Sequence, residues 1–600
     1  MPIPLHTALA SQAAESAVLG LRPRLHAAPM GDAAAPQALA RLTETTRCSV
    51  KNRAAARWLA GAIKAIRSRD FQRAQTLALK ALGRDEQLGL AWHVLAIARE
   101  KAGDLGAALR CYEAALKLDA QAEAVAGDLG RLAFRLGMPE TAAKLFAHYL
   151  QAKPGDTEGV NNLACALRDL NRCEDAISVL RPVLLERPGE ALLWNTLGTV
   201  LCSQGDAAGA VIFFDEALRL APGFGKALHN RAYARIDLGD VEGALSDCEA
   251  ALVDAATAED RATMAFARST ALLALGQLSD GWRAYEARLD EDLPDAPRFR
   301  LPGRRLDPGE DLAGKTLLIC AEQGLGDEVM FANVLPSALA ALGDGKATVA
   351  VERRLVDLFA RSFPSARVVA HRTVAFEGRV YRSAPEVEEA AFDAWTPMAS
   401  LLGDFRPTAA DFSKATAYLT ADPDRVSRWR GLLDALGPQP KIGLLWKSLK
   451  LDGDRARQFS PFALWEPVLR TPGVDFVNLQ YGDCETELAL ARDQFGVEIW
   501  VPPGVDLKNE LDEVTALCKA VDLVIGFSNA TINLAGACGA PVWLITASGA
   551  WTRLGTAHYP WYPTARTFAT SDYSDWSQVM GQIAAALSQH VGAGREPASW

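Results

Sequence analysis

A period of 34 residues runs through the first half of this 600-residue chain and constrains its fold more than any other feature. One loop position recurs seven times, the last after a short insertion: Arg69, Gly103, Gly137, Asn171, Gly205, Gly239 and Gly276. A small residue follows five positions later each time: Ala74, Ala108, Ala142, Ala176, Ala210, Ala244 and Gly281. Glycine and asparagine tolerate the left-handed backbone of a tight turn, and a small residue lets two helices approach closely. The period therefore predicts a stack of antiparallel helix pairs.

This pattern resembles the tetratricopeptide repeat, with about seven repeats over residues 53–289. Such repeats form a superhelix whose groove binds peptide segments or partner proteins. In one family of repeat-bearing protein glycosyltransferases, an asparagine ladder on the first helices holds the backbone of the protein substrate. The candidate partner-binding residues here are Asn161, Asn162, Asn195 and Asn230. The alternative is that these are solvated polar positions on the inner helices. Residues 1–52 are rich in alanine with little periodicity, which predicts a mobile extension.

Charge and cysteine usage exclude several classes of protein. The formal net charge of −10 argues against a general nucleic-acid binder, which needs a basic surface. Ten cysteines without a C-x-x-C and eight dispersed histidines predict neither a disulfide framework nor a zinc site. The first twenty residues lack a basic region followed by an apolar run, so we expect no secretory signal. The most apolar stretch, around residues 521–546, is interrupted by polar residues, glycines and a proline, so we expect no membrane span. The sparse cysteines favour reduced thiols and a cytoplasmic protein.

The pattern changes after the repeats. Residues 290–314 are rich in proline and charge, which predicts a linker. Continuous apolar runs suited to buried parallel strands then begin, with TLLICA at 316–321 in a first series and KIGLLW at 441–446 in a second. We therefore predict two Rossmann-like units, 315–436 and 437–600. Two such units in tandem suggest the GT-B architecture, in which the active site is the cleft between them.

Five segments occur in a suggestive order: AEQGLGDEVMFANVLP, IGLLW, VNLQYGD, VDLVIGFSNATINLAGACGAPVWLI and PWYP. Together they resemble glycosyltransferases related to the heptosyltransferase family, in the branch that fuses tetratricopeptide repeats to a GT-B domain. The most similar members of that branch are bacterial flagellin glycosyltransferases that attach nonulosonic acids such as pseudaminic acid. The resemblance implies a metal-independent transferase with a sugar-nucleotide donor, no further cofactor, and a role in flagellum assembly and motility.

A carboxylate follows two glycines in the loop after the first predicted strand. Asp327 can cap the following helix or face the cleft. In the resembled family, the aspartate of this Gly-Asp pair acts as the general base on the acceptor hydroxyl. A Ser or Thr hydroxyl needs such help to lose its proton as it attacks an anomeric carbon. Glu322, at the end of the strand, is the second catalytic candidate.

Most donor-binding candidates follow strands of the second unit. In the related family the nucleotide phosphate lies at the start of the helix after IGF, where backbone N–H groups and the helix dipole favour an anion. The alternative is a plain capped helix. Many relatives carry Asp-Thr and a His where this chain has Ser528, Asn529 and Asn533, which favours an acidic sugar on a CMP carrier over a neutral one, unless the site has degenerated. Basic residues could neutralise phosphate or sugar carboxylate, and Gln480 and Tyr481 could contact the base. The predicted donor-binding residues are Gly324, Gly326, Lys447, Ser448, Arg457, Gln480, Tyr481, Ser528, Asn529, Ala530, Thr531, Asn533 and Arg553.

A rival motif is the D-x-D of metal-dependent GT-A enzymes, which occurs at Asp452–Asp454 and Asp422–Asp424. The two-unit pattern argues against that class, so we predict no metal. The sequence thus indicates a protein O-glycosyltransferase that transfers a nonulosonic acid from its CMP donor to Ser or Thr of flagellin held by the repeats. One alternative is a neutral-sugar UDP or GDP donor or a glycan acceptor. The other is a non-catalytic repeat adaptor or export chaperone with a degenerate GT-B half.

Overall fold

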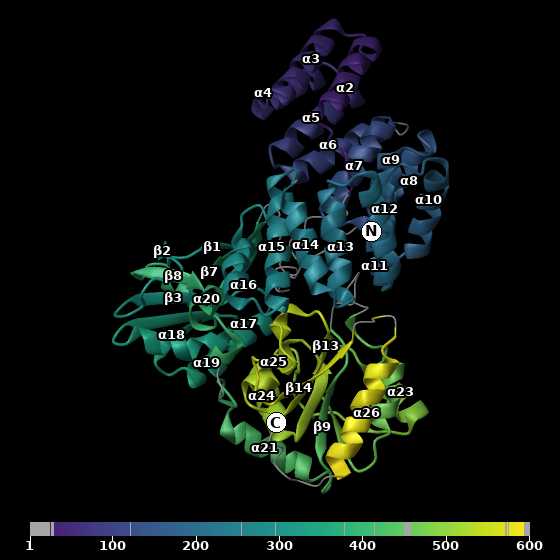
Figure 1. Cartoon of the computed structure of the whole chain (residues 1–600). Coiled ribbons are helices and arrows are strands. Elements are labelled where there is room, and N and C mark those ends of the chain that lie inside the picture. Colours follow the sequence, from purple (N-terminus) through teal and green to yellow (C-terminus); the bar gives the residue numbers. More distant parts are fainter. Residues whose placement is uncertain are drawn as a thin grey trace. The chain divides into compact units, whose positions relative to one another are not determined.

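The structure is a computed structural model, and it divides the chain into two compact units that are described separately below (Figure 1). One unit comprises His26–Gln204 with Ile212–Pro222, and the other comprises Met1–Leu25, Gly205–Val211 and Gly223–Trp600. The described residues are 25, 29–119, 122–253, 255–294, 296–376, 379–412, 415–448, 458–570, 573 and 575–592.

Helix pairs succeed one another through the repeats as the period predicts. The helices are α3 (Arg53–Arg67), α4 (Phe71–Leu82), α5 (Gly89–Lys101), α6 (Leu105–Leu118), α7 (Glu123–Arg135), α8 (Pro139–Ala152), α9 (Thr157–Asp169), α10 (Cys173–Glu186), α11 (Ala191–Gln204), α12 (Ala207–Leu220), α13 (Gly225–Asp237), α14 (Val241–Val253), α15 (Ala258–Ala274) and α16 (Leu278–Tyr285). All seven loop positions have φ between 59° and 92°. Each alanine five positions later is fully buried, and a Cβ on Gly281 would lie 2.6 Å from Leu273 Cδ2. The small residues are therefore needed where the two helices of a pair meet.

The prediction of a mobile extension over residues 1–52 is wrong for its last part. Residues Pro36–Ser49 form helix α2, which packs against α3. Leu39, Leu42 and Thr46 lie on one face of this helix and are buried. The three positions follow the i, i+3, i+7 spacing of a helical stripe, which is too short to stand out in an alanine-rich sequence. Residues 1–24 lie outside the described part of the chain.

The α/β region begins with a five-stranded parallel sheet. Its strand order is β2 (Arg304–Arg305), β8 (Ala394–Pro397), β3 (Thr316–Cys320), β4 (Lys346–Val351) and β5 (Ala366–Ala370). Leu317 and Ile319 of β3 face a core shared with α17 (Leu325–Phe331) and α18 (Leu335–Leu342). On the other face, Leu318 and Cys320 belong to a separate, smaller hydrophobic cluster.

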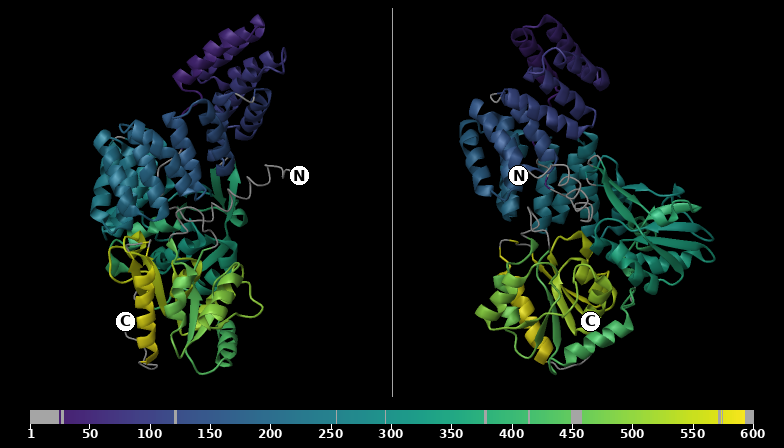
Figure 2. Two further views of the ribbon diagram at one scale, coloured as in Figure 1. Left: turned by 90° about the vertical axis from the view of Figure 1, so that its right-hand side faces the viewer. Right: turned by 180° about the vertical axis from the view of Figure 1, so that it is seen from behind.

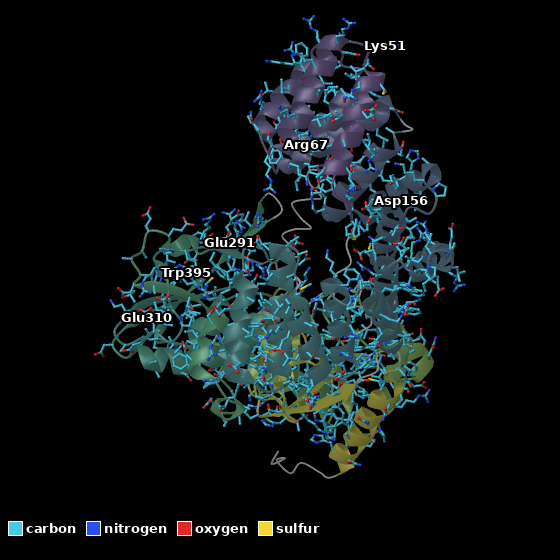
Figure 3. The ribbon with its side chains drawn as sticks, turned by 45° about the horizontal axis from the view of Figure 1, so that its top comes forward. Lys51, Arg67, Asp156, Glu291, Glu310 and Trp395 are labelled. Carbon is cyan, nitrogen blue, oxygen red and sulfur yellow. The ribbon has the colours of Figure 1, made fainter. Side chains whose placement is uncertain are left out.

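The expected linker 290–314 is folded into this region instead. It supplies β2 and also β1 (Arg298–Arg300), which pairs with β7 (Arg379–Ser383) in a small sheet completed by β6 (Arg372–Phe376). The Phe299 ring lies 5.4 Å from the ring of Trp395, and Glu310 forms an ion pair with Arg304; Figure 3 labels Trp395 and Glu310. Because β1 pairs with Tyr381 and its neighbours and β2 pairs with Ala394 and Trp395, both far along the chain, composition alone does not reveal the pairing.

A second parallel sheet follows, with six strands. Its order is β11 (Ile499–Trp500), β10 (Asp475–Asn478), β9 (Lys441–Leu445), β12 (Leu523–Phe527), β13 (Val542–Ala547) and β14 (Ala565–Thr570). Helices α24 (Leu511–Ala520) and α25 (Ala530–Ala537) cover one face, and α22 (Glu466–Leu469), α23 (Glu485–Phe495) and α26 (Ser577–Gly592) cover the other (Figure 2). The predicted fold class is confirmed: an all-helical repeat superhelix precedes an α/β region of Rossmann-like parallel sheets.

The last repeat shares its core with the α/β region. Buried residues of α15 and α16, such as Phe266 and Tyr285, belong to one hydrophobic cluster with residues of both sheets. Trp282 Nε1 donates to the carbonyl of Arg406 at 2.9 Å, and the Trp282 ring meets Trp561 edge to face. Repeat and α/β elements therefore form one unit here, with no free hinge between them.

One helical stretch of the described residues, Leu325–Leu342, is long and apolar enough to cross a membrane by composition alone. It comprises α17, α18 and the 3-10 turn η2 (Ala332–Val334) between them, and 56% of it is buried inside the protein. Burial against the first sheet accounts for its apolar character.

Candidate active site

A pocket opens where the repeat helices α13 and α15 meet loops of both α/β sheets. It lies at the carboxyl ends of β12 and β13, which is the usual place for ligands in parallel sheets. Its lining also includes residues of α17 and of the segment that leads into α25. The lining residues are Tyr233, Ile236, Asp237, Thr270, Asp327, Met330, Gln458, Phe459, Phe527, Ser528, Asn533, Ile545, Thr546, Ala547, Gly549, Ala550, Trp551, Thr552, Tyr573 and Trp576.

Asp327 combines the two roles that the sequence left open. Its carboxylate accepts a hydrogen bond from Gly324 N at 3.1 Å, so it caps α17. The residue is also half-buried and lines the pocket. A carboxylate at a helix N-terminus is stabilised in its charged form, which is the form a general base needs. Asp327 is therefore both a cap and a candidate base.

Asn533 joins the first glycine-rich loop to the second sheet. Its Nδ2 donates to the carbonyl of Gly326 at 3.0 Å, and its Oδ1 accepts from the Tyr562 hydroxyl at 2.9 Å. A Cβ on Gly326 would lie 2.9 Å from Asn533 Nδ2 and 3.3 Å from Ala530 N. The absence of a side chain at Gly326 thus allows α17 and α25 to meet. Asn533, predicted to bind the donor, lines the pocket, but its polar atoms are used in this junction.

The start of α25 is capped as the alternative interpretation proposed. Asn529 Oδ1 accepts from Ile532 N at 3.2 Å, and Asn529 and Thr531 are buried. The amide nitrogen Nδ2 of Asn529 is buried and has no hydrogen-bond partner among the residues that the structure describes. An unsatisfied buried donor is costly, which makes this amide group a candidate donor to a ligand oxygen, although Asn529 is not among the residues that line the pocket. Ser528, the residue before it, is half-buried and lines the pocket.

Glu322 does not fit the catalytic role predicted for it. Its side chain is fully buried and forms two hydrogen bonds with Arg288, at 2.8 Å and 2.9 Å. The backbone N–H of Ala399 donates a third at 2.9 Å. Burial alone would lower the pKa of Arg288, but the carboxylates of Glu322 and Glu286 raise it above its usual range. Glu322 is therefore the counterion of a buried arginine and fastens η1 (Glu286–Leu289) to β3.

The predicted base-binding and cation positions after β9 and β10 are also structural. Gln480 is buried, and its Oε1 accepts from Trp446 N and Lys447 N at 3.0 Å and 2.9 Å. The ammonium group of Lys447 forms an ion pair with Glu487 on α23. Ser448 is buried, and Tyr481 packs against the main core. These four residues stabilise the carboxyl edge of the sheet, and none lines the pocket.

Arg553 holds a pocket loop in place. It donates to the carbonyls of Ser548 at 2.9 Å and Thr556 at 3.4 Å, and burial lowers its pKa. The bonds close the turn that carries Trp551 to the pocket wall. The other predicted cation, Arg457, lies outside the described residues together with Asp452–Asp454.

The second D-x-D motif is a helix cap. Asp422 Oδ1 accepts from Asp424 N and Arg425 N, both at 3.0 Å, at the start of α21 (Pro423–Asp434). In the part of the chain that the structure describes, no group of three or more His, Cys, Asp or Glu side chains could hold a metal ion. The PWYP segment is part of the hydrophobic core, since Trp561 and Tyr562 are buried.

The pocket contains residues that the sequence did not single out. Tyr233, Asp237 and Thr270 come from repeat helices and bring the repeat architecture to the pocket wall. Trp551 and Trp576 follow strands of the second sheet. The clustering of aromatic residues after β13 and β14 was a usable signal, whereas the repeat residues follow the helical pattern and carry none.

The repeat asparagines are buried, so the solvated alternative is wrong. Asn161, Asn162, Asn195 and Asn230 are each at most 3% exposed. Asn161 Nδ2 donates to Asn162 Oδ1 at 3.0 Å, and the Thr196 hydroxyl donates to Asn161 Oδ1 at 2.6 Å. Asn161, Asn162 and Thr196 therefore form a hydrogen-bonded network within the inner helices.

Comparison with known proteins agrees with this architecture. Residues 93–157 and 161–223 match the tetratricopeptide repeat family. The chain is 60% identical to Protein FlbA of Caulobacter vibrioides over 570 residues, which is 95% of each chain. The chain is thus a tetratricopeptide repeat protein with an α/β region, and it belongs to the FlbA family.

Similar solved structures cover the repeats. A tetratricopeptide repeat protein from Parabacteroides merdae is 15% identical with a TM-score of 0.36, over 39% of this chain and 93% of that one. YrrB, described as a repeat protein with an unusual peptide-binding site, is 20% identical with a TM-score of 0.25, over 31% of this chain and 95% of that one.

Proposed function

We propose that the chain is a protein O-glycosyltransferase and that the pocket is its active site. The observation that carries this proposal is the meeting of Asp327, Ser528 and Asn533 of α25 with repeat helices α13 and α15 in one pocket. Tetratricopeptide repeats typically bind protein partners. Because repeat helices form one wall of the pocket, the pocket suits a protein acceptor better than a small free acceptor molecule.

In the proposed reaction, Asp327 takes the proton of an acceptor Ser or Thr hydroxyl. The acceptor oxygen forms a bond to the anomeric carbon, and the bond between that carbon and the phosphate oxygen breaks. The nucleotide leaves with the electron pair. The N-terminus of α25 and the Asn529 amide group stabilise the leaving phosphate by hydrogen bonding.

The proposed donor is a CMP-linked nonulosonic acid such as pseudaminic acid. Among the described residues, Asp327 and Asp237 supply the carboxylates of the pocket wall, while Ser528-Asn529 and Asn533 stand where many relatives carry Asp-Thr and a His. The Ser528 hydroxyl binds an acidic sugar without the repulsion that a carboxylate at that position would add. The proposed acceptor is flagellin, modified in the cytoplasm, in keeping with the resemblance to flagellin glycosyltransferases.

Intact mass spectrometry tests the proposal. Purified full-length protein is incubated with flagellin and, in separate reactions, CMP-pseudaminic acid, UDP-linked neutral sugars or GDP-linked neutral sugars. We expect flagellin to gain the mass of the nonulosonic acid in the CMP reaction only. Gain from a neutral sugar would replace the donor assignment. Flagellin that binds but gains no mass with any donor would favour a non-catalytic adaptor.

A further inference from the structure

A short segment near the N-terminus lies against the inner helices of the repeats. Asn162 on α9 bonds to both backbone groups of Met30: Met30 N donates to Asn162 Oδ1 at 2.6 Å, and Asn162 Nδ2 donates to Met30 O at 2.9 Å. The Met30 residue is 37% exposed. The contact therefore uses peptide groups that any extended chain can offer.

Asn162 is oriented for this contact by its neighbours. Asn162 is 3% exposed, and its Oδ1 also accepts from Asn161 Nδ2. The network continues to Thr196 on α11. Asp156 caps the start of α9 by accepting from Gly159 N at 2.9 Å (Figure 3). The amide group is thus held in one orientation before any peptide arrives, which reduces the entropy lost on binding.

The next two residues of the segment, Gly31 and Asp32, lie next to charged side chains of the repeat helices. Gly31 has φ +103°, and a Cβ there would lie 3.1 Å from both Arg131 Nη1 and Glu158 Oε2. Asp32 forms an ion pair with Lys101 at 2.7 Å. Burial alone would raise the pKa of Asp32, but the hydrogen bond from Lys101 leaves it below its usual value. The contacts come from α5, α7 and α9, which are the first helices of three successive repeats.

We propose that this surface is a binding site for an extended peptide in which a glycine precedes an acidic residue, and that Met30–Asp32 occupies it in cis. Asn162 holds the peptide backbone, the left-handed backbone at Gly31 (φ +103°) selects glycine, and Lys101 binds the carboxylate. A partner segment of this chemistry must displace the chain's own segment to bind.

One consequence rests on the proposed function: the Met30–Asp32 segment then competes with the protein acceptor and slows sugar transfer. The occupancy of the surface by this segment does not rest on the proposed function. Helix α2 follows the segment and packs against α3, so the segment remains tethered near the site after it is displaced. A tethered competitor acts at a high effective concentration.

Amide hydrogen exchange of the full-length protein tests occupancy. We expect the Met30 amide to exchange at least roughly 10-fold more slowly than in a free peptide, because its hydrogen must be released from Asn162 first. In Asn162→Ala the protection should disappear. Exchange of Met30 at the free-peptide rate in the wild type would overturn the proposal.

Peptide binding tests competition. The probe is a fluorescent peptide with the sequence of residues 29–36, PMGDAAAP. Asp32→Lys places a cation opposite Lys101 and should release the segment, so the full-length variant should bind the probe roughly 10-fold more tightly than the wild type, about 1.4 kcal/mol. Adding Asn162→Ala to that variant should abolish the gain.

The matched control is Glu44→Lys, which reverses a charge on the exposed face of α2, where Glu44 pairs with Arg47. It should bind the probe as the wild type does. Equal affinity of the wild type and Asp32→Lys, or no binding to either, would overturn the competition. Neither measurement uses a sugar donor, so failure of transfer leaves this result standing and the reverse also holds.

Discussion

In the repeats, a buried side chain such as Asn162 holds a peptide backbone, whereas in the α/β region buried polar side chains such as Glu322 and Gln480 hold the fold itself. Because successive repeats stack side by side, a polar side chain on an inner helix faces the groove of the superhelix. The strands of a parallel sheet are covered on both faces, so a polar side chain at their ends meets another element. The candidate chemistry of the α/β region is left to the half-buried positions at helix starts, Asp327 and Ser528.

The largest effect on stability should come from the Arg288–Glu322 pair. Glu322→Ala leaves a fully buried guanidinium without its bidentate partner, which costs roughly 3–5 kcal/mol. Urea unfolding of the full-length protein, followed by tryptophan fluorescence, measures the loss. Glu291→Ala is the control, since it removes an exposed carboxylate (Figure 3). Equal unfolding midpoints for the two variants would contradict a structural role for Glu322.

The next effect should come from the contact between α17 and α25. Gly326→Val places a side chain against Asn533 and the backbone of Ala530, which cannot move without shifting the helix. We expect a loss of roughly 1–3 kcal/mol in unfolding free energy, together with loss of transfer activity.

Gly431→Ala is the matched control for that variant. Gly431 lies in the helix α21 with nothing near the position of its Cβ, so alanine there should leave stability unchanged or raise it by up to about 1 kcal/mol. A Gly326→Val protein as stable and active as the control would show that the two helix starts need not meet.

A smaller effect separates binding in the repeats from chemistry in the pocket. In the Asp32→Lys background, where the chain's own segment is released, Asn162→Ala removes the hydrogen bonds to the acceptor backbone but lies outside the pocket. KM for flagellin should therefore rise by roughly 10-fold while kcat stays within a factor of about two. Steady-state transfer kinetics measure both constants. A fall in kcat with unchanged KM would mean that Asn162 does not contact the acceptor.

The smallest effect concerns the reactivity of the cysteine thiols, which reports how tightly the repeats and the α/β region are packed. Cys48 on α2 is exposed, and the other nine cysteines are buried. Burial, with help from Asp247, raises the pKa of Cys248 to about 12, and burial likewise raises that of Cys320 to about 12. At pH 8 we expect iodoacetamide to add once to the native protein, at Cys48, as read by intact mass. Rapid addition at a second thiol would show that one of these cores opens.

The repeats were predictable because their geometry is local. The turn at Asn171 and the close contact at Ala176 depend on residues within one helix pair, and both recur with the period. The buried strands β3 and β9 were predictable from their continuous apolar runs, and the sequence placed Asp327 and Ser528 at the pocket through their position after strands.

The wrong predictions share one cause: each residue contacts a partner residue that lies far along the chain. Glu322 meets Arg288 from the preceding repeat, and Gln480 meets the backbone that follows β9. The strand β1 consists of charged and aromatic residues and pairs with β7, whose position no local pattern gives. Burial of a polar side chain depends on such contacts, so its role as counterion or catalyst cannot be deduced from spacing alone.

The most direct test of the proposed function is the rate of sugar transfer to flagellin by Asp327→Asn, read by intact mass beside the wild type. Asparagine keeps the size of the side chain and an oxygen for the Gly324 N–H, but it cannot accept a proton. We expect flagellin to bind with unchanged affinity and transfer to fall by roughly 10²–10⁴-fold. Transfer at the wild-type rate would contradict the assignment of Asp327 as the base and of this pocket as the site of catalysis.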